Sequence, residues 1–222
     1  RVDRRQRQMC IRDSCIADFI KVISSLIEKG YAYEAGGNIY FDTSKLEKYY
    51  VFNDFKEEDL AVGVREGVEE DGNKRNKADF VLWFTKSKFD AQELKWDSPW
   101  GVGYPGWHIE CSAMSEKYIP LPLDIHGGGL DLIFPHHENE IAQTEAALGK
   151  PLANIWMHNG FVQVDSEKMS KSLGNFKTIR DILESYLAET LRYFLAGKHY
   201  RSPIDFSLDN MDESERSQKR VY

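Results

Sequence analysis

Two lysines and two serines fall within five residues of this chain, in the segment Lys168-Met169-Ser170-Lys171-Ser172. A Leu-Gly-Asn sequence follows at positions 173–175 and gives the segment a flexible exit. Ammonium groups three residues apart on a short loop suit a polyphosphate, because each brings a compact positive charge to oxygens that gain negative charge during transfer. A solvated basic loop would contain the same residue types, so the segment alone leaves both interpretations open.

Cys111, His136 and Glu140 offer three kinds of metal ligand. His136 and Glu140 are four residues apart on a predicted helix, so they share a face and can converge on one ion. His137 and Glu138 are expected to point elsewhere. One thiolate, one imidazole and one carboxylate suit Zn²⁺. The spacing is not that of a zinc finger, however, and a polar helix start near a buried cysteine would look the same.

The run His126-Gly127-Gly128-Gly129 follows a predicted strand. Open α/β sheets bind ligands where their strands end, and glycine lets the backbone approach a nucleotide closely. A plain turn between a strand and a helix has the same composition, so the run indicates a binding position only together with other motifs.

The bulk composition is that of a globular protein with one large or two modest domains. The 222 residues are 41% hydrophobic and 13% aromatic. No apolar run reaches the ~20 residues needed to span a bilayer, and the Arg-rich first 14 residues lack the apolar centre of a signal peptide. Three cysteines favour a reduced, cytosolic setting. A net charge of −7 argues against a surface that binds nucleic acid throughout, although a local basic patch remains possible.

The first half of the chain is predicted to be mixed helix and sheet. Apolar residues at helical spacing predict a helix over 16–27 that Gly30 ends. A hairpin is expected over 31–41, with its turn at 36–38, and Phe80–Phe84 is predicted to be a buried strand. Two prolines and three glycines make residues 98–106 rigid and irregular.

The second half is predicted to alternate between helices and strands. Helices are expected over 107–118 and from about 135 to 148, ended by Gly149. Strands are expected at 123–126, 155–158 and 161–164, with a loop at 127–129. Thr178 is predicted to cap a final helical pair, with Asp181 completing a capping box. This alternation predicts an α/β fold with a largely parallel sheet.

Four motifs, taken together, carry a family resemblance. The lysine segment resembles the second signature of class I aminoacyl-tRNA synthetases, which closes over ATP while the amino acid is adenylated. The segments Trp107–Met114, His126–Asp131 and Phe134–Glu140 resemble cysteinyl-tRNA synthetases in order and spacing. The resemblance extends from about Ile16 to about Asn210.

The resemblance implies a fold and its division. The fold would be α/β, comprising the second half of a class I synthetase Rossmann-like nucleotide-binding fold, an inserted α+β connective domain and the start of a helical C-terminal region. The implied divisions are a tail at 1–14, the connective domain at 15–98, the nucleotide fold at 99–165, the lysine loop with its helices at 166–200, and the tRNA-binding start at 201–222.

The implied function is ATP-dependent activation of L-cysteine to cysteinyl-adenylate and its transfer to tRNA(Cys), by a cytoplasmic monomer that uses Mg²⁺ with ATP. Lys171, assisted by Lys168, would stabilise charge on the α-phosphate and pyrophosphate while the substrate carboxylate attacks. The resemblance implies ATP contacts by Lys168, Met169, Ser170, Lys171, Ser172, Gly127, Gly128 and Gly129, substrate contacts by Trp107, His126 and Asp131, and zinc ligation by Cys111, His136 and Glu140.

In this family a zinc ion is held by two cysteines, a histidine and a glutamate, and the fourth protein ligand has no counterpart here. Zinc would select cysteine over serine, because Zn²⁺ binds thiolate strongly whereas a hydroxyl is a poor neutral ligand. Size alone discriminates weakly between such near-isosteres. Two alternatives stay open: a cysteine-activating ligase of the mycothiol-biosynthesis type, and a non-catalytic zinc-binding module.

The first class I signature, His-x-Gly-His, does not occur in this sequence. We therefore expect an internal fragment that binds zinc weakly and does not catalyse adenylation alone. Residues 1–14 and 217–222 resemble translated adapter sequence, and we hypothesise that they are not native.

Overall fold

The computed structural model describes residues 13–52, 71–87, 94–164 and 166–221, so most of the predicted 1–14 tail lies outside the described residues. The chain forms two compact units. Unit 1 contains the residues up to His126 together with Ile133–Ile155, and unit 2 contains Gly127–Leu132 and the residues from Trp156 onward. Among the described helices, none combines the length and apolar character needed to cross a membrane.

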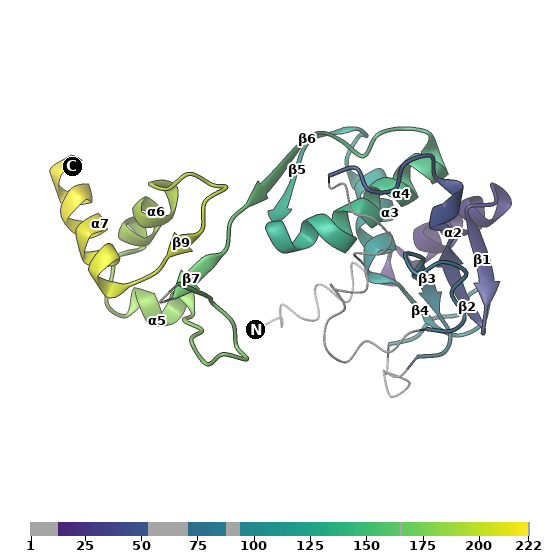
Figure 1. Ribbon diagram of the computed structural model, residues 1–222, viewed down its shortest axis with the longest axis horizontal. Coiled ribbons are helices and arrows are strands. Elements are labelled where there is room, and N and C mark those ends of the chain that lie inside the picture. The colour runs from purple at the N-terminus through teal and green to yellow at the C-terminus, as the bar shows by residue number, and fades with distance from the viewer. Residues whose placement is uncertain (1–12, 53–70, 88–93, 165, 222) are drawn as a thin grey trace. The chain divides into compact units, whose positions relative to one another are not determined.

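The first part of unit 1 is a helix packed on an antiparallel sheet (Figure 1). The helix is α2 (Ile16–Glu28), and the four strands pair in the order β1-β2-β3-β4. The strand bounds are Ala32–Ala35 for β1, Asn38–Phe41 for β2, Phe80–Phe84 for β3 and Tyr104–Pro105 for β4. The predicted helix, hairpin and buried strand are confirmed.

The hairpin turn between β1 and β2 depends on two glycines. Gly36 and Gly37 have φ angles of 59° and 92°. A tight turn with positive φ at both central positions matches the twist of paired strands, and glycine adopts it without steric cost. A short 3₁₀ turn, Thr43–Lys45, follows the hairpin, and the Asp42 side chain caps it by accepting from the Ser44 N–H.

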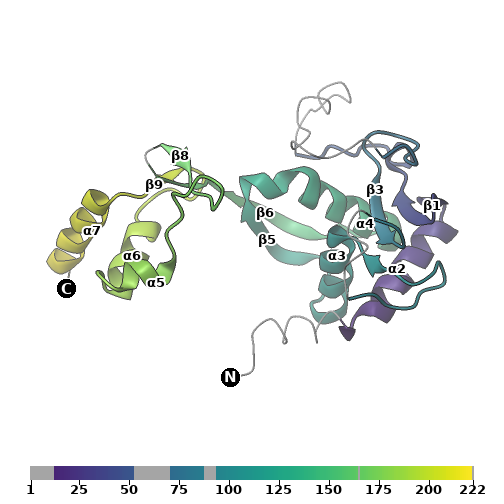
Figure 2. The same ribbon diagram turned by 90° about the horizontal axis from the view of Figure 1, so that it is seen from below.

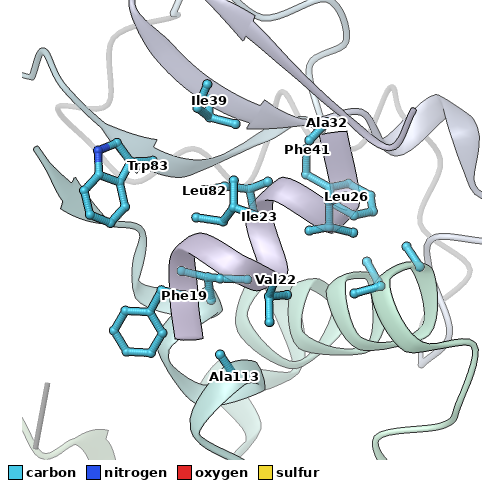
Figure 3. Packing of buried hydrophobic residues seen from close by; sticks show 14 of the residues in the cluster. Phe19, Val22, Ile23, Leu26, Ala32, Ile39, Phe41, Leu82, Trp83 and Ala113 are labelled. Atoms are coloured by element: carbon cyan, nitrogen blue, oxygen red, sulfur yellow. The ribbon is translucent and has the colours of Figure 1, made fainter. Parts of the chain in front are cut away.

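Two further helices complete the core of unit 1 (Figure 2). These are α3 (Trp107–Tyr118), over the predicted range, and α4 (Glu138–Leu148), which ends at Gly149. Phe19 and Ile23 of α2, Trp83 of β3, Ile109 of α3 and Ala142 of α4 belong to one buried cluster, much of which is shown in Figure 3. Residues on both sides of position 98 therefore share one buried cluster, and the division at that position stays a prediction.

Helix α4 begins later than predicted. A 3₁₀ turn (Leu130–Leu132) and a π-helical turn (Ile133–His137) precede it. Within the second turn Phe134 is extended, with φ −127° and ψ 132°. A residue before proline is driven away from the helical region by the proline ring. Phe134 and Pro135 therefore keep this segment out of regular helix, and α4 starts at Glu138.

The chain passes between the units within strands β5 (Leu123–Gly129) and β6 (Ala153–Asn159), which form a two-stranded sheet. In unit 2, β7 (Val162–Val164) pairs with β8 (Glu167–Lys168) and β9 (Ile204–Asp205). The β7–β8 pair is antiparallel and the β7–β9 pair is parallel.

Three helices accompany this sheet: α5 (Ile179–Leu183), α6 (Ala188–Ala196) and α7 (Leu208–Val221). Helices α6 and α7 lie side by side in both views (Figures 1 and 2). Leu191, Phe194, Phe206 and Met211 form the small core of unit 2. Thr178 and Asp181 form the predicted capping box at α5.

The mixed α/β character is confirmed, but two finer predictions are wrong. In the described residues the strands after residue 107 do not form one largely parallel sheet, because they divide between a two-stranded sheet and a three-stranded sheet with one parallel pair. Gly127–Gly129 is not a loop, because β5 continues through it beside β6. Glycine tolerates extended backbone, and here the neighbouring strand decides the conformation.

Candidate functional site

The three predicted metal ligands come together in unit 1. Cys111 lies on α3, His136 in the turn before α4, and Glu140 in the first turn of α4. One donor atom from each lies within 4.8 Å of the others. His136 and Glu140 are buried and Cys111 is half-buried. The packing of α3 against α4 thus brings a thiol, an imidazole and a carboxylate to one point.

Glu140 directs its two oxygens to different histidines. Oε2 lies 2.8 Å from His126 Nε2. Oε1 lies 3.3 Å from His136 Nε2, yet in the described part of the chain this buried oxygen has no hydrogen-bond partner. Burial opposes ionisation of Glu140, but the hydrogen bond to His126 and the charges of His126 and His136 outweigh it and lower its pKa to about 2.

This unpartnered oxygen is the observation that fits a cation. Buried carboxylate oxygens are costly without a donor or a metal ion. Burial, followed by the negative charge of Glu140, raises the pKa of Cys111 to about 12. A bound cation reverses this effect on a thiol, because a coordinating thiolate is deprotonated outright. The donor set, with one soft sulfur, one nitrogen and one oxygen, suits Zn²⁺.

His137 is not part of the group of Cys111, His136 and Glu140, but it also lies near Glu140. His126, His137 and Glu140 form a second group whose donor atoms lie within 4.8 Å of one another. The rings of His126 and His137 are 5.0 Å apart between centroids. His126, predicted as a substrate contact, thus lies against a predicted metal ligand. Helical spacing could not reveal this, because His137 precedes the regular helix and β5 supplies His126.

Glu138 does point elsewhere. Its carboxylate accepts the backbone N–H groups of Val51 at 2.8 Å and Phe52 at 2.9 Å. Asn139 is the next residue after Glu138, and its side chain accepts a hydrogen bond from the Tyr49 hydroxyl. Residues 49–52 therefore hold the start of α4 in place.

Two residues of α3 frame His136 from the opposite side. Trp107 is 54% exposed and stacks on the His136 ring, with centroids 4.2 Å apart and an angle of 22° between the planes. His108 Nδ1 lies 2.8 Å from His136 Nδ1. His108 was not among the predicted site residues. Its position three residues before Cys111, on the same face of α3, is the signal that could have found it.

The lysine segment of unit 2 is a loop organised by its own hydrogen bonds. The Ser170 N–H donates to Asn175 Oδ1 at 2.8 Å, and the Asn175 side chain donates to the Lys168 carbonyl at 3.3 Å. The Ser170 and Ser172 hydroxyls are 3.1 Å apart. Met169 packs against the core of unit 2. The loop therefore has a defined conformation, in which Ser172 is exposed and Ser170 is half-buried.

The two lysines differ in their surroundings. Lys168 Nζ lies 3.4 Å from Asp131 Oδ2 and 4.0 Å from the centroid of the Phe161 ring. Lys171 Nζ lies 5.5 Å from the centroid of the Phe176 ring. Asp131 and Lys168, predicted as substrate and ATP contacts, are thus neighbours.

The glycine run ends beside Asp131. A Cβ added at Gly129 would lie 2.5 Å from Asp131 Oδ1, so a larger residue there would displace that carboxylate. Gly127, Gly128 and Gly129 remain predictions as ATP contacts.

Comparison with known proteins agrees with these motifs. Residues 4–216 match the family described as tRNA synthetases class I (C) catalytic domain. The cysteine–tRNA ligases of Nitratidesulfovibrio vulgaris (strain DP4) and Lawsonia intracellularis are each 60% identical to the chain over 208 residues, which is 93% of this chain. That of Geobacter metallireducens is 56% identical over 207 residues. The chain spans 42% of the length of each of these relatives.

A solved structure shares the fold. A crystal structure described as an arginyl-tRNA synthetase from Campylobacter jejuni matches with a TM-score of 0.53 and 16% identity. The match covers 88% of this chain and 34% of that one. At this identity the likeness concerns the fold alone.

Proposed function

The chain belongs to the tRNA synthetases class I (C) catalytic-domain family, and from this premise we propose that it is part of a cysteine–tRNA ligase. The ligase would activate L-cysteine with ATP and Mg²⁺ and transfer it to tRNA(Cys). The names of the similar ligases and the lysine loop support this reaction. A cytoplasmic monomer, and the division into a connective domain and half of a Rossmann-like fold, belong to the same proposal.

The cluster of Cys111, His136 and Glu140 carries the proposal. Donor atoms within 4.8 Å, together with a buried Glu140 oxygen that lacks a partner, support zinc binding by these three residues. When bound, zinc would supply a ligand position that favours the sulfur of cysteine over the oxygen of serine. The exposed Trp107 ring, stacked on His136, would form a wall of the amino-acid site.

The chain's own residues would act on ATP by position and charge. Lys171 would place a positive charge against the α-phosphate and the departing pyrophosphate, and Lys168 would assist. Ser170 and Ser172 would offer hydroxyl groups to phosphate oxygens. Asp131, which contacts Lys168, would bind either the positive ammonium group of the substrate or a ribose.

Zinc affinity measured by competition with a chelating dye tests the ligand assignment. Cys111→Ser, His136→Asn and Glu140→Gln should each weaken zinc binding by more than about 100-fold, because outer-shell partners alone contribute about 10–100-fold. His199→Asn and Glu145→Gln make the same kinds of change at exposed positions and should leave the affinity unchanged.

A variant that keeps the parent affinity would remove that residue from the ligand set. A parent chain that binds no zinc would overturn the metal site.

A further inference from the structure

The two ring nitrogens of His136 face different neighbours. Nδ1 lies 2.8 Å from His108 Nδ1, within hydrogen-bond distance. Nε2 lies 3.3 Å from Glu140 Oε1, and Glu140 belongs with His136 and Cys111 to the candidate metal group. The ring planes of His108 and His136 are 47° apart and their centroids are 5.0 Å apart. His136 is therefore held between a second imidazole and the candidate metal position.

The geometry restricts where the hydrogens can be. Two imidazole nitrogens at this distance attract each other only if one carries a hydrogen and the other presents a lone pair. Nε2 makes no hydrogen bond to Glu140 Oε1, since that oxygen has no partner in the described part of the chain. A nitrogen that binds a metal must present a lone pair. A neutral His136 with its lone pair at Nε2 carries its hydrogen at Nδ1, so His108 Nδ1 must be the acceptor.

We propose that His108 is a positioning residue, which accepts the Nδ1–H of His136 and so fixes the tautomer whose Nε2 lone pair points toward Cys111 and Glu140. The inference rests on the proposed metal site. His108 would not touch the ion itself. It would act through His136, as outer hydrogen-bond partners do for metal-bound histidines.

The surroundings of His108 give it a fixed ring plane. The Phe80 ring packs against it edge-on, with centroids 5.8 Å apart and an angle of 88°. The Trp107 ring stacks on His136, and its centroid lies 5.6 Å from the centroid of the His108 ring. Because α3 carries both His108 and Cys111, one helix supplies a ligand and the group that orients the next ligand.

Two substitutions of His108 distinguish loss of the hydrogen-bond acceptor from loss of the ring. In His108→Asn the amide oxygen can replace the Nδ1 acceptor, because an asparagine side chain reaches the same position. His108→Phe keeps a ring of similar size and has no acceptor. His199→Phe, in unit 2, is the matched control for loss of one histidine.

Long-range ¹⁵N–¹H spectra of the metal-free chain, labelled at its six histidines, report each tautomer directly. We expect His136 in the Nδ1–H form in the parent, His108→Asn and His199→Phe chains, and a shift toward the Nε2–H form in His108→Phe. Zinc affinity should fall about 10–100-fold in His108→Phe and change less than about threefold in His108→Asn.

An Nε2–H form of His136 in the parent chain would overturn the proposal, even if zinc binds tightly. Equal zinc affinity in His108→Phe and the parent would also overturn it. A parent chain with the Nδ1–H form that binds no zinc would contradict the metal site and not the hydrogen bond. If His108→Phe fails to fold, the parent and His108→Asn spectra still decide the question.

Discussion

Glu140 is the residue on which the candidate metal centre depends. Its side chain is fully buried, and it belongs to both groups of candidate ligands. An ionised carboxylate in such a place is costly unless positive charge or donors compensate it. His126 supplies one donor, and the second oxygen remains without one among the described residues. A cation between Glu140, His136 and Cys111 would satisfy that oxygen.

We make a second prediction for a single residue, in the lysine loop. Lys171→Ala should weaken binding of a fluorescent ATP analogue to this chain by about tenfold. A charge-assisted hydrogen bond contributes about 1.5–3 kcal/mol, and 1.4 kcal/mol corresponds to a factor of ten. Fluorescence anisotropy measures the dissociation constant.

Lys177→Ala is the control, since Lys177 is an exposed lysine six positions further along the chain. Equal losses in the two variants would mean that net charge, and not the position of Lys171, determines nucleotide binding.

At the scale of elements, the first turn of α4 is held from outside the helix. Glu138 accepts two backbone N–H groups, from Val51 and Phe52, and Asn139 accepts from the Tyr49 hydroxyl. His136 and Glu140 flank these residues in the sequence. Residues 49–52 therefore fix the turn that presents two candidate ligands.

Glu138→Ala should lower the free energy of unfolding by about 1–3 kcal/mol, because two partly buried N–H groups lose their acceptor. Urea unfolding followed by tryptophan fluorescence measures the change. Glu145→Ala, at an exposed position of the same helix, should stay within about 0.5 kcal/mol of the parent. A similar loss in both variants would show that the Glu138 contacts add nothing beyond helix composition.

The elements that depend on local sequence were predictable. Helix α2, the hairpin and the capping box at α5 follow from apolar spacing, paired glycines and a Thr-x-x-Asp pattern. The predicted largely parallel sheet and the loop at Gly127–Gly129 were wrong, because strand partners are distant in the sequence and no local pattern specifies them.

The site was predictable where helical spacing or a motif defined it. His136 and Glu140 are four residues apart, Cys111 is a ligand type that suits the same ion, and the resemblance implies all three. The positions of His108 and His137 could not be predicted, since both depend on how α3, β5 and the turn before α4 approach one another.

At the scale of the whole molecule, the two compact units hold different parts of the proposed chemistry. Unit 1 contains the cluster of Cys111, His136 and Glu140, and unit 2 contains the lysine loop with Asp131. The chain spans 42% of the length of its curated relatives. Amino-acid selection can therefore be tested with substitutions in unit 1, in an experiment that does not require the chain to catalyse the whole reaction.

The most direct test of the central claim is the response of the cobalt-loaded chain to L-cysteine and L-serine. Cobalt replaces zinc and reports each added thiolate as charge-transfer absorption in the near ultraviolet. We predict that L-cysteine increases this absorption, that L-serine does not, and that cobalt stays with the protein on gel filtration. The Glu140→Gln chain should lose the response. Equal responses to both amino acids, or an unchanged cysteine response in Glu140→Gln, would contradict thiol selection at this cluster.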